Sequence, residues 1–212
     1  DAETGKIIWQ YKRNVPYLTT IQRVSTPSIV GQNLVVGMAD GNVVALSLDD
    51  GALLWEKKIA TQSKFIDVDA TPLAIEEGIF VGSLGGQAQL MDRNNGNTIQ
   101  SFPYTISRGP RFIKGRYYLG TYDGRLLKMD AHLNVLEEKK LFTDPITAIV
   151  FWKGKLVVAH AGADIKLLDI DNLQTVESFS FGHRYSAVLG SIESGEGNLV
   201  ILSARNRLYS FR

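Results

Sequence analysis

The sequence predicts an all-β fold, a β-propeller made of four-stranded antiparallel blades. Three observations predict it. A sequence element recurs at intervals of about 40 residues, β-branched runs alternate with Asp-Gly and Gly-Gly turns, and no segment keeps the 3.6-residue apolar period of an amphipathic helix over three turns. Small sheets that follow one another in this way bury both faces by stacking radially, as the blades of a propeller do.

The recurring element is a turn followed by a tryptophan. Asp1-Ala-Glu-Thr-Gly-Lys-Ile-Ile-Trp9 aligns without gaps with Ser47-Leu-Asp-Asp-Gly-Ala-Leu-Leu-Trp55, and more weakly with residues 92–100. Degraded copies follow, so that the equivalent positions are 1, 47, 92, 130, 169 and 210. We interpret Trp9, Trp55 and Trp152 as packing residues, the first two because they occupy the repeat position.

One period shows how the strands are separated. The runs 33–37, 42–46 and 52–55 are divided by Asp-Gly dipeptides. Such dipeptides are typical of tight hairpins, because Gly, Asn and Asp tolerate the positive φ that these turns require. A further strand enters each of the first three blades through a proline, a residue that fits the first position of a strand; these prolines are Pro27, Pro72 and Pro110.

We expect a single propeller domain over residues 1–212, with four complete blades and a fifth that lacks its outer strand. The blades span about 20–60, 64–102, 106–141, 145–180 and 185–211. Residues 1–13, with Lys6 to Lys12 as the strand, would complete the fifth blade and leave no open sheet edge. The chain starts inside a turn that ordinarily follows a strand, so the alternative is that these blades are the C-terminal part of a larger propeller.

The composition excludes several classes of function. The 212 residues, 44% of them hydrophobic, are enough for one domain with a buried core. The absence of cysteine excludes disulfides, thiolate zinc sites, iron–sulfur clusters and cysteine nucleophiles. A formal net charge of +1 provides no electrostatic footprint for nucleic acid or an anionic membrane. The longest apolar stretches are far shorter than the roughly 20 residues that span a bilayer.

No catalytic or metal-binding constellation is predicted. The glycine-rich segment 82–86 precedes no helix whose N-terminus could bind a phosphate, and the Gly-x-Ser-x-Gly motif of serine hydrolases is absent. The three histidines lie on three different blades without a partner at the spacing of metal ligands. They are His132, His160 and His183.

The turn-and-tryptophan element resembles the blade motif of the quinoprotein-like propellers, in which the tryptophan packs over the neighbouring blade and the glycine turn docks against it. A narrower resemblance is to the BamB family, propeller lipoproteins of the outer-membrane β-barrel assembly machinery. It is carried by Leu18-Thr-Thr-Ile21-Gln-Arg23-Val-Ser-Thr-Pro27, by the blade around 33–55, and by Ile66-Asp67-Val68-Asp69-Ala70-Thr71-Pro72. The resemblance covers essentially the whole chain as the C-terminal five of eight blades, and it is specific over about 18–72.

The resemblance implies a partner-binding surface on two adjacent blades, which would bind the third POTRA domain of a BamA-type barrel-assembly protein. In that surface Leu18 and Ile21 are the apolar anchors, Arg23 is a forked donor to backbone or carboxylate, and Asp67 with Asp69 is the acidic counterpart. This chain has one residue more than the family between Leu18 and Arg23, so the first motif aligns only with a slip. An apolar centre with an arginine and a charged rim is a usual composition for a partner surface.

These residues also have structural alternatives. Asp67 and Asp69 precede Thr-Pro and would cap a turn with side-chain hydrogen bonds, or hold calcium if more acidic residues were nearby. Leu18 and Ile21 would equally suit the core. A basic cluster is interpreted as a solvated loop, with a contact site as the alternative; its members are Arg108, Arg111, Lys114 and Arg116.

The sequence thus predicts a non-catalytic interaction scaffold without a cofactor. The resemblance implies a periplasmic protein at the outer membrane, attached through a lipid anchor outside this chain. It implies a BamA-type POTRA partner and contact with unfolded outer-membrane proteins, but no nucleic acid. One alternative is a quinoprotein dehydrogenase that carries pyrroloquinoline quinone and calcium; the alcohol dehydrogenases of that class have adjacent cysteines over the cofactor, which this chain lacks. Another is an unrelated propeller interaction module.

Overall fold

The computed structural model describes residues 1–14, 25–106, 108–183, 185–190, 192–195 and 197–212. These residues form five antiparallel sheets and no helix. A helix long and apolar enough to cross a membrane is accordingly not found among them. In every sheet the strands lie side by side in chain order, which is the arrangement predicted for propeller blades.

The chain divides into two compact units, unit 1 from Asp1 to Gly109 and unit 2 from Pro110 to Arg212. In unit 1, blade 1 contains β1 (Ser28–Val30), β2 (Asn33–Gly37), β3 (Asn42–Ser47) and β4 (Leu53–Lys58), and blade 2 contains β5 (Leu73–Ile75), β6 (Gly78–Val81), β7 (Ala88–Met91) and β8 (Thr98–Phe102). In unit 2, blade 3 contains β9 (Arg111–Ile113), β10 (Arg116–Gly120), β11 (Arg125–Met129) and β12 (Val135–Lys140). Blade 4 contains β13 (Ile146–Trp152), β14 (Lys155–His160), β15 (Asp164–Asp169) and β16 (Thr175–Ser180), and blade 5 contains β17 (Ile192–Gly195), β18 (Asn198–Leu202) and β19 (Leu208–Phe211).

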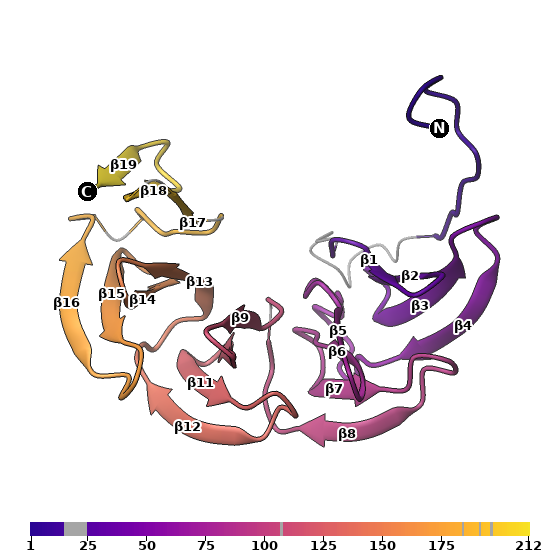
Figure 1. Ribbon diagram of the computed structural model, residues 1–212, viewed down its shortest axis with the longest axis horizontal. Helices are drawn as coiled ribbons and strands as arrows, with labels where there is room; N and C mark the ends of the chain where they lie inside the picture. The colour runs from indigo at the N-terminus through magenta and orange to yellow at the C-terminus, as the bar shows by residue number, and fades with distance from the viewer. Residues whose placement is uncertain (15–24, 107, 184, 191, 196) are drawn as a thin grey trace. The chain divides into compact units, whose positions relative to one another are not determined.

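All four complete blades share one irregularity, a β-bulge between the third and the fourth strand. Figure 1 shows the fourth strand of each complete blade, β4, β8, β12 and β16, as a curved ribbon at one edge of its sheet. The bulge lies one residue before the turn in every case, at Ala45/Leu46, Leu90/Met91, Lys128/Met129 and Leu167/Leu168. A bulge increases the local twist and bends the strand that follows. The common position confirms the repeat equivalences at 47, 92, 130 and 169.

The turns that follow these bulges are built alike. The carboxylate of the first residue accepts a backbone N–H two residues on in Asp92, Asp130 and Asp169, at 2.8, 2.9 and 3.0 Å between nitrogen and Oδ1. Each of these turns, and also the N-terminal turn at residues 1–5, ends on a residue with positive φ, which is glycine in the first three turns along the chain and leucine in the last two. These residues are Gly5, Gly51, Gly96, Leu133 and Leu173.

The last repeat position differs from the prediction by two residues. Phe211 lies opposite Leu199 in blade 5, just as Leu46 lies opposite Leu34 in blade 1. Arg212 is therefore the equivalent of Ser47, and the predicted position, Ser210, is wrong. The apolar Leu-Tyr pair before Ser210 resembles the lead-in of the other copies, but the pairing of β18 with β19 sets the register.

Blade 5 has three strands, and residues 5–14 are not part of any strand in the described structure. Completion of this blade by residues 6–12 stays a prediction.

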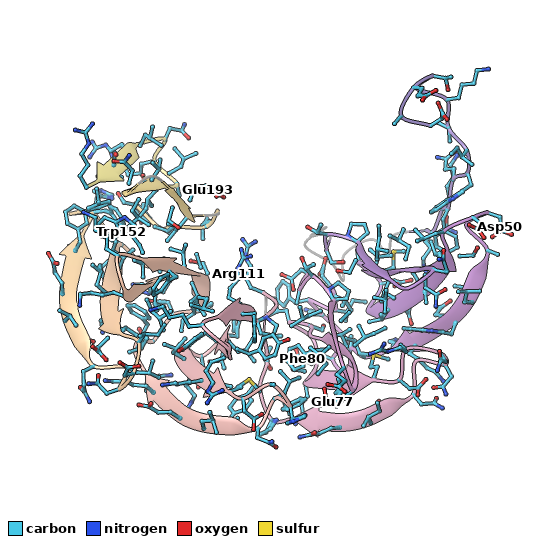
Figure 2. All side chains as sticks on the ribbon, in the orientation of Figure 1. Asp50, Glu77, Phe80, Arg111, Trp152 and Glu193 are labelled. Carbon is cyan, nitrogen blue, oxygen red and sulfur yellow. The ribbon has the colours of Figure 1, made fainter. Side chains whose placement is uncertain are left out.

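Within each unit the core lies between neighbouring blades. Blades 1 and 2 share an apolar cluster that includes Val35, Trp55 and Ile79, and blades 3 and 4 share one that includes Leu126 and Leu156. A further cluster joins blades 4 and 5. Figure 2 shows Phe80, which is 1% exposed, within blade 2. Full burial of one such side chain contributes about 1.5–3 kcal/mol, so these clusters stabilise the stacking of neighbouring blades.

Candidate partner-binding site

The loop between β4 and β5, residues 59–72, contains one of the two predicted binding motifs. Backbone hydrogen bonds attach it to both blades of unit 1. The amides of Ile59 and Ala60 donate to the Gly41 carbonyl at 2.9 and 3.2 Å, and those of Thr61 and Gln62 donate to the Gly85 carbonyl at 2.9 and 3.1 Å. The loop is therefore held against the connection between the second and third strands of each blade.

Close packing of this loop explains the glycine-rich segment 82–86. A Cβ atom on Gly85 would lie 2.8 Å from the Cα of Ile66, and one on Gly86 would lie 2.3 Å from the carbonyl oxygen of Ile59. Real Cβ atoms do not approach backbone atoms this closely. These glycines are needed because another backbone segment passes over them, a common reason for glycine at such positions.

Within the loop, Val68 is the residue fixed most firmly. Its amide donates to the Met38 carbonyl at 3.1 Å, and its side chain is fully buried. Asp67 is also fully buried, and its carbonyl accepts a hydrogen bond of 3.0 Å from the Ser83 hydroxyl, whereas Asp69 is half-buried. Burial of Asp67 favours its alternative role in shaping the turn. A docking role for either carboxylate stays a prediction.

Sequence reasoning missed Phe65, which stands two residues before Asp67. Its side chain is 52% exposed and its backbone has a φ of 54°. A bulky residue pays about 1–2 kcal/mol in this left-handed region, and such strain clusters at ligand clamps and active sites. The available signal was a large apolar residue in a polar stretch, after Ser63 and Lys64.

The other predicted motif lies outside the described residues. Leu18, Ile21 and Arg23 fall within 15–24, and the structure does not test their placement. The residues on either side of this segment are described, and both contact blade 1. The Ser25 hydroxyl accepts a hydrogen bond of 2.8 Å from the Gly37 amide, and Arg13 binds Asp40.

Arg13 is an electrostatic anchor for the N-terminal segment. Its Nε and Nη2 atoms donate to Asp40 Oδ2 at 2.8 and 2.5 Å, and Nη2 also donates to Glu56 Oε1 at 2.7 Å. The hydrogen bond to Glu56 raises the pKa of Arg13 above its ordinary value, although burial opposes it. The same bond lowers the pKa of Glu56. The three side chains form a charge-assisted network, which fixes geometry better than isolated surface pairs.

Residues 37–41, the end of β2 and its connection to β3, contact described residues on either side of segment 15–24 and the middle of the second motif. Ser25 binds Gly37, Arg13 binds Asp40, and the Met38 carbonyl receives the amide of Val68. The two motifs are separated by about 45 residues in the chain, but this connection holds the flanks of one and the middle of the other. Of the two motifs, the structure describes the support of the second, residues 66–72, together with Ser25 at the end of the first.

The described structure offers no clear place for a metal ion. No group of three or more His, Cys, Asp or Glu side chains in the described ranges is arranged to hold one. His160 has several structural contacts. Its Nε2 lies 2.9 Å from Asp164 Oδ1, and its Nδ1 accepts a hydrogen bond from the Gly162 amide at 3.2 Å. Its ring stacks on Phe142, in the connection between β12 and β13, with 3.9 Å between centroids. These contacts indicate a structural histidine.

Comparison with known proteins agrees with the family resemblance. Residues 1–132 match the family described as "Outer membrane protein assembly factor BamB". The BamB of Yersinia pestis is 25% identical over 217 aligned residues, which cover 98% of this chain and 54% of that protein. A shorter match is to the quinoprotein alcohol dehydrogenase PedH of Pseudomonas putida, 30% identical over 92 residues that cover 41% of this chain and 15% of that protein.

Solved structures confirm the fold class as a β-propeller. BamB from Moraxella catarrhalis matches with a TM-score of 0.73 and 20% identity over 97% of this chain and 63% of that one. The WD40 β-propeller domain of Doa1 matches with a TM-score of 0.63 and 14% identity over 88% of this chain and 62% of that one. The chain spans about half the length of the BamB protein of Yersinia pestis.

Proposed function

This chain belongs to the BamB family of outer membrane protein assembly factors, and from that premise we propose that it is a non-catalytic scaffold of the outer-membrane β-barrel assembly machinery that docks a POTRA domain of a BamA-type protein. The observation that carries this proposal is that residues 37–41 bind both Ser25, near the end of the first motif, and Val68, between the two aspartates of the second. Loops on a rigid sheet scaffold bind at a low cost in conformational entropy.

The proposed mechanism is positioning, with no bond made or broken. Leu18 and Ile21 supply apolar contact at the centre, and the exposed ring of Phe65 extends it. Arg23 donates to a backbone carbonyl or carboxylate of the partner, and Asp69 accepts from a cationic or amide group. Apolar and aromatic anchors dominate the affinity of such surfaces, while charges at the rim set orientation and the rate of association.

The family also supports a cellular setting, which belongs to the proposal. The chain acts in the periplasm at the outer membrane, and a lipid anchor outside this chain attaches it. Unfolded outer-membrane proteins are further partners, for which no described residue is singled out.

A capture experiment tests the docking site. The intact chain, the charge-reversed variant Arg23→Glu with Asp69→Lys, and a matched control, Arg207→Glu with Asp171→Lys in unit 2, are immobilised and exposed to a purified POTRA-domain protein of the BamA type. We expect capture by the intact chain and the control, and loss of capture by the Arg23/Asp69 variant at an unchanged melting temperature. Equal capture by all three would remove the site assignment.

Phe65 provides a second, uncharged test of the same surface. Because its ring is half exposed and its backbone is strained, Phe65→Ala is expected to leave thermal stability nearly unchanged while it weakens capture by roughly tenfold, as for an apolar anchor. Exposed Ile29 is the control position, since Ile29→Ala removes a similarly exposed apolar group from β1. Weakening by both variants alike would argue against a specific role for Phe65.

The short match to a quinoprotein alcohol dehydrogenase keeps a redox function as the second candidate. Absorbance of the purified chain after incubation with pyrroloquinoline quinone and calcium, and its reduction of an artificial electron acceptor with alcohols, decides between them. A bound chromophore with turnover would replace the scaffold proposal.

A further inference from the structure

Two adjacent hairpins of unit 2 share a sequence pattern and a backbone conformation. Ile113-Lys114-Gly115-Arg116 connects β9 to β10, and Trp152-Lys153-Gly154-Lys155 connects β13 to β14. In both, the lysine and the glycine have positive φ, 47° and 77° in the first and 45° and 80° in the second. Positive φ at both central positions is the type I′ hairpin turn. Each tip therefore presents an apolar residue, a lysine, a glycine and a second cation in the same order.

Aromatic rings support these cations. The Lys114 Nζ lies 4.7 Å from the centroid of the Phe151 ring, and the Lys153 Nζ lies 5.1 Å from that of Trp152. The tips are also tied together and to blade 5. The Trp152 indole donates to the Gly197 carbonyl at 3.0 Å, and the Ser194 hydroxyl donates to the Phe151 carbonyl at 3.1 Å. The two lysine ammonium groups thus lie over aromatic rings, and the attraction between a cation and a ring face favours this position.

These cations are not neutralised within the described part of the chain. Lys114, Arg116 and Lys153 are exposed and Lys155 is half-buried, and none of the four forms an ion pair with a described residue. The equivalent hairpin of blade 2 carries the exposed Glu76 instead. The charge is therefore particular to blades 3 and 4 and is not a property of every hairpin at this position.

The residues around these lysines favour an acidic protein segment over a continuous anionic surface such as a membrane. Phe112, 60% exposed, packs against Tyr117 with 4.8 Å between ring centroids and offers apolar surface beside the lysines. An acidic residue also lies beside the cations, since Asp169 stands opposite Lys155 in the register of β14 and β15. A continuous anionic surface such as a membrane would meet both signs of charge. Trp152, whose indole is bound to Gly197, is not free to insert into lipid.

We propose that the hairpin pair, residues 113–116 and 152–155, is a docking surface for an acidic polypeptide segment of a partner protein, one in which carboxylates flank an apolar side chain. The carboxylates bind Lys114, Arg116 and Lys153, and the apolar side chain packs on Phe112. Arginine and aromatic side chains are enriched in protein interfaces, and unpaired cations steer an acidic partner toward the surface. None of these residues belongs to the POTRA site proposed in unit 1.

Titration with a defined probe tests the proposal. A fluorescent peptide of four Glu-Glu-Leu repeats is titrated with the full chain and followed by anisotropy, and a Gln-Gln-Leu peptide serves as the probe control. The variant Lys114→Asn with Lys153→Asn removes both charges but keeps the turns, because asparagine tolerates positive φ. The matched control is Lys12→Asn with Lys58→Asn, two exposed lysines of unit 1.

We expect saturable binding of the acidic peptide by the chain and by the control, and about tenfold weaker binding by the Lys114/Lys153 variant, since two exposed charge contacts contribute roughly 1.4 kcal/mol together. Salt near 1 M, where the screening length is about 3 Å, should abolish the difference.

Equal binding by the Lys114/Lys153 variant and the control variant, or equal binding of the Gln peptide, would overturn the proposal. Binding of phosphatidylglycerol vesicles in place of the peptide would overturn it in favour of a membrane surface. Capture of the POTRA protein should be unaffected by the Lys114/Lys153 variant, so the two proposals fail separately.

Discussion

Trp9 and Trp55 make the same contact with the turn that follows them in the fold. Their indole nitrogens donate to the carbonyls of Leu48 and Arg93 at 2.9 and 3.1 Å. Each ring covers the glycine that ends that turn, and a Cβ atom on Gly51 would lie 2.6 Å from the Cε3 of Trp9. The contact expected from the quinoprotein-like motif is therefore present in unit 1.

Unit 2 replaces this contact with other residues. At the equivalent turn of blade 4, the Ile170 carbonyl accepts a hydrogen bond of 3.1 Å from the Lys128 ammonium, and fully buried Leu173 stands in the position of the glycine. Glu137, opposite Lys128, occupies the position of the tryptophan. Leu173 belongs to the apolar cluster shared by blades 3 and 4, so this degraded repeat still buries an apolar group at the turn.

A substitution at Gly51 tests the tryptophan contact. Gly51→Ala places a methyl group against Trp9 at a residue with a φ of 72°, so both the clash and the backbone strain oppose it. We expect a loss of about 2–4 kcal/mol of unfolding free energy in chemical denaturation. Gly31→Ala is the control, because Gly31 has a φ of 63° and no atom within 4 Å of its Cβ position. Its loss should be limited to the strain of about 1 kcal/mol. Equal losses would show that Trp9 does not press on Gly51.

At the scale of an element, the connection between β10 and β11 shows how hydrogen bonds and a nearby cation stabilise an ionised carboxylate in a tight turn. The Thr121 hydroxyl donates to Asp123 Oδ1 at 2.5 Å, the Arg125 Nε donates to Oδ2 at 2.8 Å, and the Lys140 ammonium also contacts Asp123. Burial disfavours the charged carboxylate, but these hydrogen bonds and the charge of Lys140 outweigh it and lower the pKa of Asp123 to about 2. The ionised form therefore stabilises this turn.

Acid should weaken this turn in a defined range of pH. Because the pKa of Asp123 falls from 3.8 to about 2 on folding, its contribution is complete above pH 4 and is lost as the pH falls through 2. Denaturation between about pH 5 and pH 2.5 should show stability decreasing toward acid. The part due to this residue is small, since its side chain is 54% exposed. Asp123→Asn should reduce the slope relative to the unsubstituted chain. An unaltered slope in Asp123→Asn would contradict the assignment.

At the scale of the whole molecule, the prediction to test is that residues 6–12 complete blade 5. The register in which Val43 faces Lys57 in blade 1 would place Tyr11 opposite Leu208 if residues 6–12 completed blade 5. The alternative is that this chain represents the last five blades of a larger ring. The two arrangements differ in whether these residues meet within one chain.

Cysteine cross-linking distinguishes the two arrangements, because the chain has no cysteine of its own. Tyr11→Cys with Leu208→Cys should form an intramolecular disulfide on mild oxidation if blade 5 is closed by residues 6–12, since directly paired strand positions lie within disulfide range. The product is detected by its mobility without reductant and by mass. Each single variant is the control. Failure of the double variant to cross-link as a monomer would contradict closure and favour the larger ring.

The sequence by itself determined the fold class, the order of the strands and the family. Periodic Asp-Gly turns, the recurring tryptophan and β-branched runs are local signals, and local signals suffice to define a blade whose strands are neighbours in the chain. The register of β19 was predicted two residues too early, because pairing with β18 and not the pattern of apolar residues sets it.

Only the tertiary structure decided which residues meet and which remain accessible. Residues 37–41 hold the flanks of one motif and the centre of the other because two blades stack side by side, a relation that no local pattern encodes. The same packing buries Asp67 and leaves Phe65 exposed. It also brings the Lys114 ammonium onto Phe151, a residue that the sequence places 37 positions away. Contacts between distant segments depend on the shape of the assembled blades, and that shape is settled only when the side chains pack.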